Sequence, residues 1–84
     1  MYQIFFKYTI KPKILKLKSQ IEFFLKLNST YGVKQQIFET KMEIRKLTKN
    51  PIFRNVPKFA NDEMYSFWIE FLELVEQFKY KILN

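Results

Sequence analysis

The chain has 84 residues, with 15 Lys or Arg against eight Asp or Glu, which gives a formal net charge of +7. This length fits one domain, and 48 % hydrophobic residues with a single Gly are not the composition of a disordered or fibrous protein. His and Cys are both absent. Their absence excludes thiol and imidazole catalysis, disulfide bonds and the usual zinc and haem sites, so we expect no cofactor. No apolar run reaches the roughly 18 residues of a transmembrane span.

The charge is unevenly distributed along the chain. Residues 1–60 hold 13 basic and three acidic side chains, whereas residues 61–84 hold two basic and five acidic ones. No acidic residue precedes Glu22. Mitochondrial targeting segments are also basic and free of acids, although they favour Arg and Ser, which are scarce here. A mitochondrial protein and a protein of a phage-infected bacterium are both consistent with this pattern.

Residues 1–11 are predicted to form an extended arm or strand. Every second residue in this segment is large and apolar, namely Tyr2, Ile4, Phe6, Tyr8 and Ile10. Alternation places these side chains on one face of a strand, whereas a helix would scatter them around its axis. Pro12 ends the segment, because the residue before a proline is disfavoured in the α region. Such an arm could pair with a strand of a partner through residues 2–10.

Residues 12–27 are predicted to form the first helix. Its apolar residues recur at about 3.6-residue spacing and define a buried stripe of Ile14, Leu17, Ile21, Phe24 and Leu25. Pro12 suits the first turn of a helix, because a backbone N–H at that position would have no intrahelical acceptor and its loss costs little. A polar turn over residues 28–32 follows. That turn also permits a DNA-binding helix-turn-helix, although no recognition helix stands out.

The second helix is predicted over residues 33–49. Its buried stripe consists of Val33, Ile37, Thr40, Ile44 and Leu47. Asn50 and Pro51 end this helix, and Pro57 indicates an irregular or extended connector over residues 50–60. Because so apolar a connector cannot face water throughout, four of its side chains are expected to cover the core: Ile52, Phe53, Val56 and Phe59.

The third helix is predicted over residues 61–83. Asn61 is its expected N-cap, and Asp62 and Glu63 complement the positive end of the helix dipole. Its buried stripe is the longest in the chain and consists of Met64, Phe67, Trp68, Phe71, Leu74, Val75, Phe78 and Ile82. The predicted fold is therefore mainly α, a single small domain over residues 1–84 in which an extended arm precedes three helices.

Some apolar residues lie outside these predicted stripes. Tyr65, Ile69 and Leu72 give the third helix a second apolar flank, and Phe38 and Met42 lie away from the core face of the second. Either the arm and the connector cover these five side chains within one molecule, or the five form an exposed protein interface.

Basic residues are the second functional candidate. Four of them, with no acid among them, crowd the first turns of the predicted helix over residues 12–27: Lys11, Lys13, Lys16 and Lys18. Cations at a helix N-terminus are unfavourable for stability because they oppose the helix dipole. Their presence there therefore favours a binding role, and a helix N-terminus surrounded by lysines can hold an anion. A second basic row interleaved with Phe38 lies on the predicted helix over residues 33–49 and consists of Lys34, Lys41, Arg45 and Lys49.

These basic rows have several possible partners. Lysines interleaved with aromatic side chains suit the RNA or DNA backbone and its stacked bases. They equally suit anionic lipid headgroups or an acidic protein surface. The alternative is that the lysines reflect AT-rich coding and simply lie on solvated helix faces.

No catalytic constellation is present. Glu39 and Glu43 are four residues apart but lack a third metal ligand, and Gly32 alone cannot form a phosphate-binding loop. We therefore expect no enzymatic activity. The sequence favours a non-catalytic accessory subunit of a larger protein or ribonucleoprotein assembly, which contacts phosphates through lysines and neighbouring proteins through apolar helix flanks. The alternative is a small inhibitor from a phage or mobile element that docks on a nucleic-acid-handling enzyme.

Overall fold

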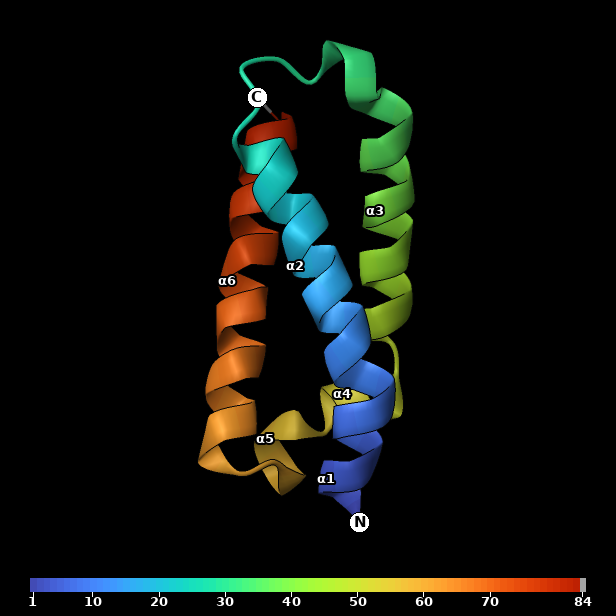
Figure 1. The fold of residues 1–84 in the computed structure, drawn as a ribbon, viewed down its shortest axis with the longest axis vertical. Coiled ribbons are helices and arrows are strands. Elements are labelled where there is room, and N and C mark those ends of the chain that lie inside the picture. The colour runs from blue at the N-terminus through green and yellow to red at the C-terminus, as the bar shows by residue number, and fades with distance from the viewer. Residues whose placement is uncertain (84) are drawn as a thin grey trace.

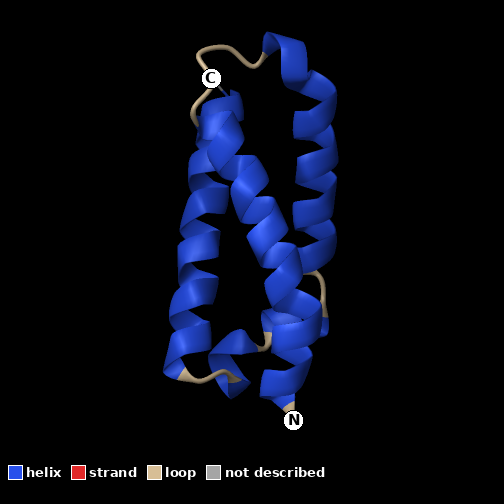
Figure 2. Cartoon of the chain, in the orientation of Figure 1, coloured by secondary structure: helices blue, strands red, loops and turns tan. Residues whose placement is uncertain are grey.

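The computed structural model describes residues 1–83, and these form a mainly helical, small single domain without strands. The prediction of a mainly α fold is confirmed. In chain order the elements are α1 (Tyr2–Phe5), the π-helical turn η1 (Phe6–Ile10), α2 (Lys11–Leu25), the 3₁₀ turn η2 (Tyr31–Val33), α3 (Lys34–Thr48), α4 (Pro51–Arg54), α5 (Val56–Phe59) and α6 (Asp62–Leu83). Short loops follow α2, α3 and α5 (Figure 2).

Residues 1–11 are helical, so the predicted extended arm is wrong, and with it the strand pairing through residues 2–10. The elements α1, η1 and α2 follow one another without a break and form one long helix (Figure 1). Phe6 and Ile10, four residues apart, are buried in the core, whereas Tyr8 between them is exposed. The side chains that enter the core therefore follow helical spacing rather than the alternation of the sequence.

Pro12 does not interrupt this long helix because a wider turn precedes it. In η1 the backbone N–H of Lys11 donates to the carbonyl of Phe6, five residues earlier. A proline ring normally clashes with the carbonyl four residues before it, and a π-helical turn changes the spacing at that point. Pro12 itself is the second residue of α2 and directly follows this wider turn.

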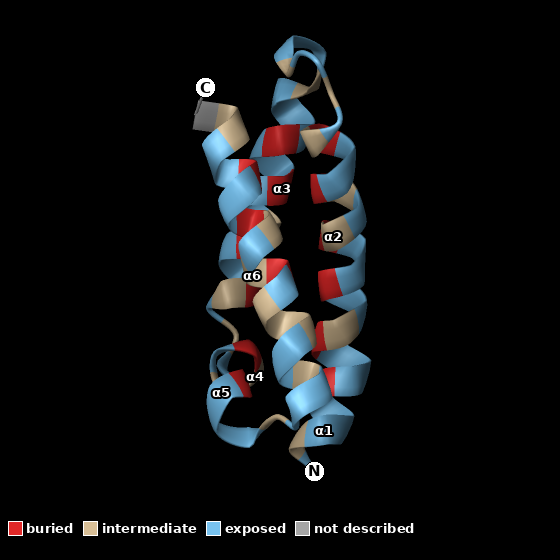
Figure 3. Ribbon diagram, turned by 90° about the vertical axis from the view of Figure 1, so that its left-hand side faces the viewer, coloured by how far each residue is buried: buried red, intermediate tan, exposed pale blue. Residues whose placement is uncertain are grey.

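Helix α2 is the central helix of the domain. It packs against α6 and against α3, whereas α3 and α6 contact each other at most weakly. Four residues of its predicted stripe are buried, as expected, namely Ile14, Leu17, Ile21 and Phe24. The fifth, Leu25, is half-buried. The buried positions of the helices face inward in Figure 3. The result is a rod of 43 × 19 × 17 Å.

The predicted stripes of α3 and α6 also face the core. On α3 the buried residues include Thr40, whose hydroxyl donates to Oε1 of Gln20 at 3.2 Å and is thereby satisfied. On α6 the centre of the stripe is buried and its remaining members are half-buried. Asn61 is the N-cap of α6, as predicted: its Oδ1 accepts from the backbone N–H of Met64 at 2.9 Å.

The connector over residues 50–60 forms two single-turn helices, α4 and α5, and is not irregular or extended as predicted. A proline lies in the first turn of each, Pro51 in α4 and Pro57 in α5, where the helix needs no N–H donor. The Asn50 side chain caps α4 by accepting from the Ile52 N–H at 2.8 Å. Because α4 packs against η1 and α3 while α5 packs against α6, the connector closes one end of the rod.

Three of the four connector side chains expected to cover the core contribute to it. Phe53 and Val56 are buried, Ile52 is half-buried and packs on the core, and Phe59 is exposed. The Phe53 ring lies 5.8 Å from the ring of Trp68. The connector therefore packs against the buried stripe of α6 at Trp68.

Tyr2 links the first turn of the long helix to the connector. Its hydroxyl donates to the carbonyl of Ile52, and burial raises the pKa of the Tyr2 phenol. We expect Tyr2→Phe to lower the free energy of unfolding by about 0.5–1.5 kcal/mol at neutral pH, because one hydrogen bond is lost.

The same substitution predicts a pH dependence. Because the folded-state pKa of Tyr2 is raised, the stabilisation is fully present below the unfolded pKa of about 10 and is lost as pH rises through the folded pKa. Urea denaturation of the parent and of Tyr2→Phe should therefore show a stability difference that shrinks above pH ~10. A difference that stays constant through this range would contradict the assignment.

Candidate functional site: a groove between helices α3 and α6

A groove of about 390 Å³ lies between α3 and α6. Both helices pack on α2, but they contact each other at most weakly, so their side chains do not close over the space between them. The lining residues are Lys41, Ile44, Arg45 and Thr48 of α3, with Leu72, Val75, Glu76, Phe78, Lys79 and Ile82 of α6.

The floor of this α3–α6 groove is apolar. Ile44, Val75 and Phe78 are core residues, and Leu72 and Ile82 are half-buried beside them. The Thr48 hydroxyl, which also lines the groove, donates to the backbone carbonyl of Arg45 at 3.1 Å and is therefore already paired. The floor thus suits an apolar side chain rather than a polar ligand.

The rim of the groove is basic. Lys41, Arg45 and Lys79 carry three positive charges, and Glu76 carries one negative charge. The Nζ atom of Lys79 lies 3.7 Å from Oε1 of Glu76, but both side chains are exposed, and such surface pairs contribute about 0–1 kcal/mol. The net charge of the rim is positive, which favours an acidic binding partner.

Among the predicted interface residues, Leu72 lines the groove. Tyr65 and Ile69 precede it on the same flank of α6, and the Tyr65 ring lies 5.7 Å from that of Trp68. Phe38 and Met42 are exposed on α3 and do not line the groove. Of the five predicted interface residues, Leu72 therefore lines the groove and the other four do not.

The second predicted basic row is also divided. Lys41 and Arg45 lie on the rim of the groove. Lys34 lies with its Nζ 5.3 Å from the centroid of the Tyr31 ring, at the other end of α3 from Lys49. Only the central pair of this row therefore shares a site with the apolar floor.

The helix N-terminus that was expected to hold an anion does not exist. Lys11, the first residue of α2, continues the helix that begins at Tyr2. The expected opposition between the lysines and a helix dipole is therefore wrong, since the residues lie within a longer helix, where the dipole has little effect.

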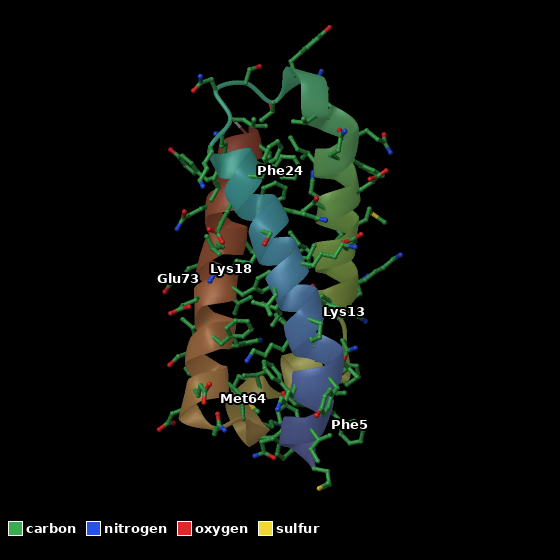
Figure 4. All side chains as sticks on the ribbon, in the orientation of Figure 1. Phe5, Lys13, Lys18, Phe24, Met64 and Glu73 are labelled. Carbon is green, nitrogen blue, oxygen red and sulfur yellow. The ribbon has the colours of Figure 1, made fainter. Side chains whose placement is uncertain are left out.

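The lysines of α2 do not form one cluster. Figure 4 shows Lys13 and Lys18 on opposite sides of the helix. Lys13 and Lys16 line a hollow of about 250 Å³ that α2 forms with α3. Lys11 instead approaches α6, with its Nζ 5.6 Å from the centroid of the Phe67 ring. Their separation follows from the 100° turn per residue of a helix.

Two basic residues at these sites are not among the predicted site residues. Lys79 lies on the rim of the α3–α6 groove, and Lys46 lines the α2–α3 hollow together with Glu43. The sequence contains a signal for Lys79, because it follows Leu72 by seven residues, or two helical turns, on the same flank. Lys46 has no such signal, because its position depends on how α2 and α3 pack.

Comparisons of the chain with protein-family models, with curated proteins and with solved structures gave no match. Among the helices of residues 1–83, none combines the length and hydrophobicity needed to cross a membrane. Over the same residues, no three acidic side chains gather in a way that could hold a metal ion.

Proposed function

We propose that this protein is a non-catalytic accessory subunit of a larger protein or ribonucleoprotein assembly, and that it binds a segment of a neighbouring protein in the α3–α6 groove. The observation that supports this proposal is the combination of an apolar floor and a basic rim in one groove. The apolar floor provides the affinity that burial of a few side chains brings. The basic rim selects among partners and speeds their association.

The partner segment has a definable chemistry. It carries apolar side chains that reach Leu72 and Ile82, with carboxylates beside them that pair with Arg45 and Lys41. An amphipathic helix with acidic flanks meets both requirements and is a common occupant of grooves between two helices. The groove volume of about 390 Å³ lies at the lower end of the range of about 300–1,000 Å³ that is usual for binding pockets.

Contacts with phosphates, if the assembly contains RNA, are assigned to the α2–α3 hollow. Three ammonium groups gather there, from Lys13, Lys16 and Lys46, with the single carboxylate of Glu43. This site is on the other side of α3 from the groove. Protein binding and phosphate binding are therefore separable by mutation.

The proposal predicts a contrast between two adjacent residues of α3. Arg45→Glu places a negative charge on the groove rim and should weaken the binding of a co-purifying partner protein at least about tenfold. Lys46→Glu makes the same charge change in the hollow and should alter that binding by less than about twofold. Both side chains are exposed, so neither change should alter stability by more than about 0.5 kcal/mol.

The measurement is a titration of the partner, recovered from the native source by cross-linking, against the parent and the two variants. Circular dichroism verifies that all three are equally helical. Equal weakening by the two variants would contradict the groove proposal. A complex in which the bound molecule is nucleic acid would also contradict it. Such binding is recognised because the logarithm of the binding constant falls linearly with the logarithm of the salt concentration, with a slope of about −0.7 per phosphate contacted on a single strand.

A further inference from the structure

The first two turns of the long helix expose a face of large apolar side chains. Met1, Ile4, Phe5 and Tyr8 are spaced by three, one and three residues, so they lie on one side of the helix. Their exposed fractions are 82, 46, 54 and 69 %. The opposite side of the same turns holds Phe6 in the core. The exposed face is thus presented on a helix that the core anchors.

This apolar face lies at one end of the rod and continues onto the connector. Figure 1 shows α1 and α5 at the same end. Phe59 of α5 is exposed, and its ring lies 5.7 Å from that of Tyr2. In Figure 4 the Phe5 side chain points away from the helices. We refer to Met1, Ile4, Phe5, Tyr8 and Phe59 together as the N-terminal tip.

Cations outnumber carboxylates around the N-terminal tip. Lys7 and Lys11 lie on the long helix, and Arg54 and Lys58 lie on the connector. The carboxylates at this end are those of Asp62 and Glu63 at the start of α6, and Glu63 lines a hollow with Lys7 and Lys11. The Nζ atom of Lys7 lies 5.7 Å from the centroid of the exposed Tyr8 ring, so charge and apolar surface are adjacent.

We propose that the N-terminal tip binds the surface of an anionic lipid bilayer, with its apolar side chains in the interfacial region and its cations at the headgroups. The face is the convex surface of a single helix and spans only two turns, about 10 Å. A bilayer interface accepts a protruding apolar surface without a complementary groove, and it takes amphipathic helices to a depth of about 5–10 Å. Tyr has a polar hydroxyl that suits this boundary, and Phe is typical of the apolar face of interfacial helices.

The charges at the tip account for the choice of an anionic surface. Basic side chains near a membrane add attraction to acidic headgroups that falls off within a Debye length. The tip involves none of the residues of the α3–α6 groove. A test that contradicts bilayer binding by the tip therefore leaves the proposal of partner binding in the groove unaffected, and the reverse also holds.

The test uses the purified full chain and vesicles of phosphatidylcholine, either alone or mixed with phosphatidylserine. Phe5→Ser should lower the partition coefficient onto the mixed vesicles at least about tenfold, because it removes an apolar side chain from the interface. The matched control is Phe23→Ser, since Phe23 lies on the same long helix and is 55 % exposed, but near its other end. This control should change partitioning less than about twofold. Tyr8→Ser provides a second tip variant and should act like Phe5→Ser.

Three results decide the proposal. Stronger binding to the mixed vesicles than to phosphatidylcholine alone, weakened by added salt, supports it. Equal binding by parent and Phe5→Ser overturns it. Absence of vesicle binding together with a dimer in sedimentation equilibrium that Phe5→Ser dissociates also overturns it, because the tip then contacts a second copy of the chain.

Discussion

Replacing Phe71 or Phe78 by Ala should lower the free energy of unfolding by about 3–5 kcal/mol in each case. Both side chains are only 1 % exposed, Phe71 near the middle of α6 and Phe78 in its last third. The Phe78 ring lies 5.8 Å from Phe24 of α2, and the Phe71 ring meets that of Phe53 edge-on at 6.0 Å. Each substitution thus opens a cavity where α6 packs against another element.

This cost is large relative to the stability of the whole domain. At about 0.05–0.15 kcal/mol per residue, a domain of this size has a free energy of unfolding of roughly 4–13 kcal/mol. Phe38→Ala is the control, because Phe38 is 57 % exposed and its removal should cost less than about 0.5 kcal/mol. Urea denaturation followed by circular dichroism measures all three. A cost below about 1 kcal/mol for both core variants would mean that this face of α6 is not the core.

Phe6→Ala should also cost about 3–5 kcal/mol, whereas Tyr8→Ala should cost less than about 0.5 kcal/mol. The helix buries Phe6 in the core and leaves Tyr8 exposed. In the strand that the sequence favours, the two residues lie on one face and would be affected alike. The contrast between the two variants therefore tests the helical conformation of the first segment.

The measurement for this pair is again the free energy of unfolding from urea denaturation. Amide hydrogen exchange adds a local readout, because the N–H of Lys11 donates to the carbonyl of Phe6 within η1 and should be protected. Similar costs for Phe6→Ala and Tyr8→Ala would contradict the long helix. A reversed order would contradict it more strongly, since the core would then contain Tyr8.

The sequence by itself determined the three longer helices and most of their buried residues. The expected ranges 12–27, 33–49 and 61–83 compare with Lys11–Leu25, Lys34–Thr48 and Asp62–Leu83. The reason is that an amphipathic helix must repeat its apolar residues at about 3.6-residue spacing, and this pattern is local. The start of α6 was also locally encoded, by the cap that Asn61 provides.

Tertiary structure decided the conformation of residues 1–11. Their alternating apolar residues are compatible with a strand, and a proline at position 12 indicates a break. Burial of Phe6 and Ile10 stabilises the helix instead, and η1 accommodates Pro12. The burial of Phe6 and Ile10 depends on packing against α4, a distant segment of the chain that no local pattern reveals.

Tertiary structure also decided which predicted site residues share a surface. Sequence patterns identified Lys41, Arg45 and Leu72 as candidates, but on two separate helices and for two separate roles. They meet at one groove because α3 and α6 both pack on α2 and scarcely on each other. Conversely, Lys13 and Lys18 are near in sequence and lie on opposite sides of α2 (Figure 4). Helical rotation separates neighbours in the chain, and only the packing of helices determines which distant residues come together.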